Sequence, residues 1–216
     1  MSQPVLAMDQ VDVVPQSPKR IAILEAASKL FVNQGFGNVS VDAIAAEAQV
    51  SKRTVYSHFE NKEALFAGVM TAVCERRGGQ AGCPLASEDL ARYMPLGEML
   101  QKTGEHVLGI ITAPETVDLF RVVIGDAGRF PDLGHNFYAF GPASMHEMVR
   151  DYLEEKASSG ELKIDDPMKA AKRYLGMMIF PVQMELACGV RDSLSGDEVR
   201  TIVESAVSDF LKLYTP

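Results

Sequence analysis

The sequence contains no run of about 18 consecutive apolar residues, which is the length that a membrane-spanning helix requires. Its longest apolar stretches, residues 107–111 and 176–182, are far shorter. Residues 1–17 hold Asp9, Asp12 and two prolines but no lysine or arginine, so they lack the basic and then apolar order of a secretory signal. We therefore expect a soluble, cytoplasmic protein without a membrane partner, in which residues 1–17 form a disordered N-terminal segment.

Cysteine is scarce, and the motifs of the common enzyme classes are missing. The three cysteines, Cys74, Cys83 and Cys188, form neither a CxxC pair nor a Cys/His cluster with zinc spacing. There is no Gly-rich phosphate loop and no GxSxG nucleophile elbow. The acidic pairs at residues 154–155 and 165–166 lie in polar, helix-end contexts. We therefore expect a reducing compartment, no cofactor, no metal ion and no enzymatic activity.

Basic residues are in the minority, which counts against nucleic-acid binding because a DNA-binding surface must neutralise phosphates with lysine and arginine. The 216 residues carry a formal net charge of −8. Between residues 18 and 62, however, six basic side chains accompany four acidic ones, so this stretch has a net charge of +2 and the remainder −10. A mildly basic N-terminal part precedes an acidic one.

Residues 18–63, which we call the head, show the periodicity of short helices. Ser40, Ser51 and Asn61 stand where N-caps are expected. We predict four helices from this pattern, over residues 19–34, 41–48, 52–59 and 62–77. The second and third are separated by a tight turn and form a helix-turn-helix, a motif whose second helix enters the major groove of DNA.

The third helix carries side chains that can donate hydrogen bonds to phosphates or base edges. Its buried side is predicted to be Val55 and Phe59. Its outward side chains are Lys52, Arg53, Thr54, Tyr56, Ser57 and His58. A short, capped, basic helix is also typical of an ordinary solvated surface, so this pattern alone leaves both interpretations open.

Residues 23–66 resemble the DNA-binding domain of TetR/AcrR-family transcriptional regulators along nearly their whole length. The resemblance rests on several groups of residues: Leu30 and Phe31 before Gly35-Phe36, Ser40-Val41, Ile44-Ala45, Val50-Ser51-Lys52, Val55-Tyr56, Phe59, and Lys62-Glu63 with Leu65. It implies a one-component regulator that binds double-stranded operator DNA.

The resemblance also implies which side chains contact DNA: Ser40, Ser51, Lys52, Arg53, Thr54, Tyr56, His58 and Lys62. The side chains that begin the third helix would enter the groove, and Ser40 would bind a phosphate at a helix N-terminus. Tyr56 would contact a phosphate or a thymine methyl, while His58 and Lys62 would clamp the backbone. Arg53 stands where many members carry a small residue, so it could add a guanine contact. The two serines could also be helix caps and nothing more.

Residues 64–216, which we call the body, also read as helices, without strand alternation or repeats. We expect an all-α fold of about nine helices: a three-helix helix-turn-helix domain over residues 18–63, then a larger ligand-binding and dimerisation domain over residues 64–216. The body helices are predicted to begin near Ser87, Pro114, Pro131, Pro167 and Asp197.

The last two helices, in the family, commonly pair with their copies in a second subunit. Here they cover residues 168–188 and 197–213, and their apolar stripes could be ordinary core or a homodimer interface. The interface residues predicted from them are Leu175, Met178, Ile179, Val182, Leu186, Ile202, Val203, Ala206 and Phe210. A homodimer also suits the head, because one helix-turn-helix reads only half of a palindromic operator.

Methionine and phenylalanine are plentiful in the body, and methionine adapts to varied apolar guests. We hypothesise that a small apolar or amphipathic effector binds there and releases a repressor from DNA. The residues predicted for this site are Met99, Phe120, Phe137, Phe140, Met148, Met177 and Phe180, each of which could instead only fill the core.

Two further interpretations remain open. In a thiol redox-sensing regulator, Cys74 beside Arg76 and Arg77, or Cys83, would be oxidised, because nearby cations lower a thiol pKa. In a helical adaptor, the fold would persist without DNA binding. The intact set of Lys52, Arg53, Tyr56 and Lys62 disfavours the adaptor.

Overall fold

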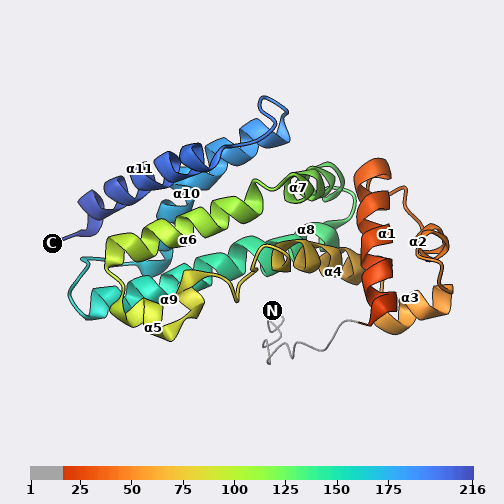
Figure 1. The fold of residues 1–216 in the computed structure, drawn as a ribbon, viewed down its shortest axis with the longest axis horizontal. Coiled ribbons are helices and arrows are strands. Elements are labelled where there is room, and N and C mark those ends of the chain that lie inside the picture. Colours follow the sequence, from red (N-terminus) through yellow and green to blue (C-terminus); the bar gives the residue numbers. More distant parts are fainter. Residues whose placement is uncertain (1–16) are drawn as a thin grey trace.

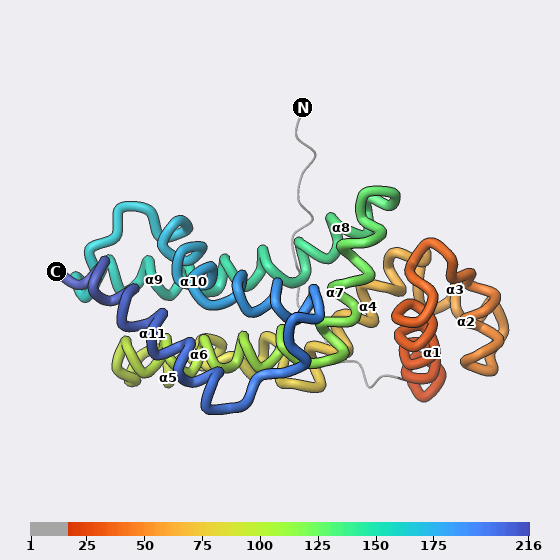
Figure 2. Tube along the Cα trace, turned by 90° about the horizontal axis from the view of Figure 1, so that it is seen from above, coloured from red at the N-terminus to blue at the C-terminus, as the bar shows by residue number. Residues whose placement is uncertain are grey.

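The computed structural model describes residues 17–216, and within this range every regular element is a helix, so the predicted all-α class is confirmed. The head forms one end of an elongated molecule, and the C-terminus lies at the other end (Figures 1 and 2). The α-helices are α1 (Pro18–Gln34), α2 (Val41–Glu47), α3 (Lys52–His58), α4 (Lys62–Glu75), α5 (Glu88–Tyr93), α6 (Leu96–Ile111), α7 (Pro114–Asp126), α8 (Pro131–Tyr138), α9 (Ser144–Ser158), α10 (Pro167–Ala187) and α11 (Gly196–Tyr214).

Helix caps explain where the head helices begin. Ser40, Ser51 and Asn61 each accept a hydrogen bond from the backbone N–H three residues later, as the sequence predicted. Ser17 caps α1 in the same way, so it belongs to the head rather than to the predicted N-terminal segment, whose residues 1–16 lie outside the described residues. Gln49, with φ of 55°, makes the left-handed turn that brings α3 across α2.

The core around the head continues into the body. Buried side chains of α1 to α4, among them Phe31, Phe36 and Phe66, pack in one cluster with Leu119 of α7 and Leu133 of α8. The rings of Phe31 and Phe66 lie 5.3 Å apart, centroid to centroid. The residues before and after the predicted domain boundary at residue 63 therefore share one hydrophobic core.

The described residues form eleven α-helices, more than the approximately nine predicted for the chain, because two expected long helices of the body are divided. Pro95 separates α5 from α6, and a π-helical segment, Ala139–Ala143, which contains Pro142, lies between α8 and α9. In contrast, α10 runs through Pro181 as one helix. Among the described residues, no helix is both long and apolar enough to cross a membrane.

The second core cluster joins α6, α9, α10 and α11, and it is tightest at Gly104 on α6. A Cβ atom placed there would lie 2.5 Å from Val203 and 2.8 Å from the hydroxyl of Tyr174. That hydroxyl also donates a hydrogen bond to the carbonyl of Leu100. Glycine is thus required at this helix crossing because backbone and side chains approach closely.

Replacing Gly104 with alanine is expected to lower the free energy of unfolding by about 1–3 kcal/mol, as overpacking of a filled core does. Gly109 on the same helix is the matched control, because a Cβ there meets nothing within 4 Å. Gly109→Ala should raise stability by about 0.4–1 kcal/mol through the lower entropy of the unfolded chain. Urea titrations followed by circular dichroism measure both variants, and equal effects at the two sites would contradict close packing at Gly104.

Candidate nucleic-acid interface

The exposed face of α3 is held outward by two buried anchors. Val55 and Phe59 are 1% and 5% exposed and pack into the core of the head. Because these two side chains occupy the inner face, Lys52, Arg53 and Tyr56 lie on the solvent face. The helix is therefore presented as the second helix of a helix-turn-helix, with its polar side free to enter a groove.

Hydroxyl groups in and just before α2 and α3 form hydrogen bonds with each other and with the backbone of their own helices. Ser51 Oγ accepts from the backbone N–H of Thr54 at 3.0 Å and lies 2.8 Å from the Thr54 hydroxyl. Ser57 Oγ donates to the carbonyl of Thr54 at 2.7 Å. Ser40 Oγ accepts from Ala43 N at 3.1 Å at the start of α2. Ser40 and Ser51 are thus both helix caps, and Ser40, predicted to bind a phosphate, lies at a helix N-terminus where anions are favoured.

The two cations of α3 differ in their surroundings. Lys52 Nζ lies 2.9 Å from a carboxylate oxygen of Asp42 on α2, and this hydrogen bond raises the pKa of Lys52. Both side chains of that pair are exposed. Arg53 forms neither an ion pair nor a side-chain hydrogen bond with any described residue. Arg53 therefore supplies the uncompensated positive charge of the exposed helix face.

Lys62 faces the turn between α1 and α2, while its role as a phosphate clamp stays a prediction. Its ammonium donates to the carbonyls of Phe36 at 2.9 Å and Val39 at 3.0 Å, and it lies 4.3 Å from the centroid of the Phe36 ring. Burial lowers the pKa of Lys62, as expected for a cation taken partly out of water. Lys62 ties the start of α4 to the turn between α1 and α2.

His58, the other predicted clamp, is half-buried at the end of α3. Its carbonyl accepts from Arg20 Nη1 at 3.4 Å, and the Arg20 guanidinium lies 4.3 Å from the centroid of the Phe59 ring. Arg20, in the first turn of α1, thus fastens α3 to α1.

Two body residues that sequence reasoning missed hold the turn between α1 and α2. The backbone N–H of Gly37 donates to Asp126 Oδ2 at 3.2 Å, and the rings of Phe36 and Phe130 meet edge to face with centroids 5.2 Å apart. Asp126 and Phe130 lie at the end of α7 and just before α8. Nothing in the local sequence signals this contact, because its partners are 89 residues apart.

The residues predicted for an effector site fall in three different surroundings. Met99 is fully buried in the core of the body. Phe120 and Phe137 are half-buried, with ring centroids 5.9 Å apart and ring planes tilted by 43°, and Met148 is also half-buried. The remaining three, Phe140, Met177 and Phe180, are exposed. These positions do not by themselves define one cavity.

The side chains of the predicted dimer stripe face the core of their own chain, which is the alternative that the sequence left open. Most of these side chains are buried inside the single chain, where they hold α10 and α11 against the rest of the body: Leu175, Met178, Val182, Leu186, Val203, Ala206 and Phe210. Ile179 and Ile202 pack partly buried against the same clusters. The exposed apolar side chains of α10 are instead Met177, Phe180 and Met184, with 37%, 68% and 41% exposure.

A redox-sensing cysteine requires an exposed thiol with a lowered pKa, and neither Cys74 nor Cys83 has one. Burial raises the pKa of Cys74, with a further contribution from Glu75, so the neighbouring arginines do not activate it. Burial raises the pKa of Cys83 as well. Cys188 is exposed. The cationic activation predicted for Cys74 is therefore absent.

At pH 7.5, Cys188 is expected to react with a disulfide reagent such as Ellman's reagent at least about ten-fold faster than Cys74 and Cys83, because the thiolate is the nucleophile. Stopped-flow or manual mixing with the wild-type protein and Cys188→Ser separates the phases. Fast reaction of two thiols in Cys188→Ser would revive the redox interpretation.

Known protein families match both the head and most of the body of this chain. Residues 23–69 match the family described as bacterial regulatory proteins, tetR family, and residues 98–216 match the C-terminal domain of AefR-like transcriptional repressors. The HTH-type transcriptional regulator YhgD of Bacillus subtilis is 43% identical over 160 residues, which cover 73% of this chain and 78% of that protein.

Two solved structures share the whole architecture. A TetR-family transcriptional regulator from Mesorhizobium loti is 25% identical, with a TM-score of 0.78 over 94% of this chain and all of the other. The flavonoid-responsive regulator FrrA is 33% identical, with a TM-score of 0.75 over 92% of this chain and 97% of its own. The matches to both parts of the chain, together with the helix-turn-helix, show that this protein belongs to the TetR family of DNA-binding transcriptional regulators.

Proposed function

We propose that this protein is a cytoplasmic repressor that binds a palindromic operator as a homodimer and leaves it when a small apolar or amphipathic effector binds. The observation that carries the DNA-binding part is the exposed face of α3, where Arg53 has no partner among the described residues and Lys52 and Tyr56 lie beside it. In this proposal Arg53 reads a guanine edge, and Lys52 exchanges Asp42 for a phosphate.

Homodimerisation supplies the second recognition helix. A single α3 covers one half-site, and two-fold symmetry would place two such helices about 34 Å apart or a multiple of it. The contact surface in this proposal is the exposed apolar side of α10, formed by Met177, Phe180 and Met184. Because these three apolar side chains share one exposed face of the helix, burying them in an interface would remove apolar surface from water.

The link between effector and DNA runs, in this proposal, through α7 and α8. These helices share a core with α1 and α4, and Asp126 and Phe130 contact the turn between α1 and α2. A shift of α7 therefore moves the head. The effector must bind the DNA-free conformation more tightly, because only a difference in affinity shifts the equilibrium. The similar regulator FrrA is flavonoid-responsive, which favours an aromatic effector here.

The experiment begins with selection of tight-binding DNA from a random pool by the purified protein. An inverted-repeat winner supports the homodimer and gives the half-site spacing, while a single half-site contradicts it. If no sequence is enriched even after the protein is denatured and refolded to remove bound small molecules, then the adaptor interpretation replaces the repressor. Effectors nominated by the genes beside genomic copies of the operator are then titrated with and without DNA, and equal affinities would rule out release by effector.

A further inference from the structure

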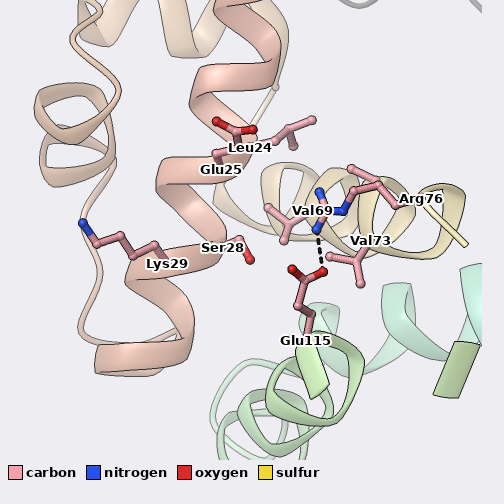
Figure 3. A pocket seen from close by; sticks show the side chains of 9 residues that line it. Leu24, Glu25, Ser28, Lys29, Val69, Val73, Arg76 and Glu115 are labelled. Carbon is pink, nitrogen blue, oxygen red and sulfur yellow. Dashed lines mark hydrogen bonds and ion pairs between the residues drawn. The ribbon is translucent and has the colours of Figure 1, made fainter. Parts of the chain in front are cut away.

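A cavity of about 420 Å³ lies where the head meets the body, between α1, α4 and the start of α7 (Figure 3). This volume falls within the range of small-molecule sites. Leu24, Glu25, Ser28 and Lys29 line it from α1, Val69, Ala72, Val73 and Arg76 from α4, and Glu115 from α7. None of these residues was predicted to bind an effector, and the cavity lies apart from the exposed face of α3.

The floor of the cavity is apolar, while its rim is charged. Leu24, Val69 and Val73 are at most 4% exposed and present only aliphatic carbon. The rim carries two carboxylates and two cations, with the half-buried hydroxyl of Ser28 between them. Such a site fits a molecule with an apolar part and one polar end.

The ion pairs around the cavity determine the charge of that polar end. Arg76 Nη2 lies 2.7 Å from Glu115 Oε2, so these two side chains neutralise one another across the cavity (Figure 3). Lys29 Nζ lies 2.6 Å from Glu47 Oε1 on α2, and Figure 3 shows its side chain extending away from Arg76. Glu25 is the remaining charged residue of the lining, and no described residue forms an ion pair with it. The unbalanced charge of the cavity is negative.

We propose that this cavity is a binding site for a small amphipathic organic cation, such as an aryl-alkyl ammonium compound. The ammonium group lies beside Glu25, and the apolar part rests on Leu24, Val69 and Val73. The occupant touches α1 and α4 at once, so it bridges the head and the body. This site does not depend on the proposed operator or on the proposed effector.

The test uses a matched pair of probes, phenethyltrimethylammonium and 3-phenylpropionate, titrated into the full-length protein and followed by amide chemical shifts in NMR. The expected result is binding of the cation, with shifts centred on residues 24–29 and 69–76. Glu25→Gln should weaken that binding by about five-fold, the effect of one exposed charge pair. Glu204→Gln on α11 removes one exposed carboxylate elsewhere and should change nothing.

A second variant tests the cavity without altering its charge. Ala72→Leu places additional aliphatic carbon in the cavity and should abolish cation binding while the thermal unfolding midpoint stays within a few degrees of wild type. Stronger binding of 3-phenylpropionate than of the cation, binding of neither, or equal affinities in the wild type and Glu25→Gln would each overturn the proposal. Selection of an operator by the same preparation has no bearing on this result, so the two proposals fail separately.

Discussion

Arg53→Ala is expected to weaken binding to the selected operator by about 5- to 150-fold per half-site, because a bidentate arginine–guanine contact is worth about 1–3 kcal/mol. Arg53 is the cation on α3 without a partner among the described residues, so no intramolecular ion pair offsets its loss. The unfolding free energy should remain unchanged, since the side chain is exposed. Fluorescence anisotropy with the selected operator and with random DNA of equal length measures the specific and the non-specific losses.

Comparing the losses of affinity for operator and for random DNA distinguishes a contact with a base from a contact with a phosphate. Loss on the operator alone, with relaxed preference at particular base pairs, supports contact with a base edge. Equal losses on both DNAs contradict it and make Arg53 a phosphate contact. Lys212→Ala is the charge-matched control, because this lysine lies on α11 at the far end of the molecule and pairs with Asp209.

Lys62→Met is expected to lower the free energy of unfolding by about 2–5 kcal/mol. The substitution removes two hydrogen bonds from an ammonium group and leaves the carbonyls of Phe36 and Val39 without that donor. Hydrogen bonds to charged groups contribute about 1.5–3 kcal/mol each, and an unsatisfied buried acceptor adds to the cost. Urea titration followed by circular dichroism measures the change.

Lys29→Met is the control for Lys62, because Lys29 forms an exposed ion pair with Glu47 and should contribute less than about 1 kcal/mol. A Lys62→Met protein that keeps wild-type stability but binds all DNA sequences more weakly would support the phosphate clamp expected from the sequence. Stability and DNA affinity therefore have to be measured on the same preparation.

The sequence predicts those parts of the fold that local physics determines. Caps such as Ser40, Ser51 and Asn61 fix where helices begin, and the spacing of Val55 and Phe59 fixes which side of α3 faces outward. These features depend on neighbours within one or two turns. The helix-turn-helix and the all-α class could therefore be predicted before any coordinates.

The sequence does not reveal contacts between residues that are distant in the chain. Lys62 resembles a surface lysine in the sequence, and only the turn at Phe36 and Val39, more than 20 residues earlier, makes it a partly buried donor. The stripe of Leu175, Met178 and Phe210 has the same 3.6-residue period whether it faces its own core or a second chain. Periodicity identifies an apolar face but not what covers it.

The continuous packing of α1 and α4 with α7 and α8 bears on how regulators of this kind can be recombined. A hybrid that takes residues 18–63 from one relative and the remainder from another would join two halves of a single core, with foreign side chains facing Leu119, Val122 and Leu133. The exchangeable unit of operator specificity is therefore smaller than the head. Grafting only the exposed positions of α3 onto an unchanged scaffold preserves every buried contact, and it is the more promising way to redirect such a protein to a new promoter.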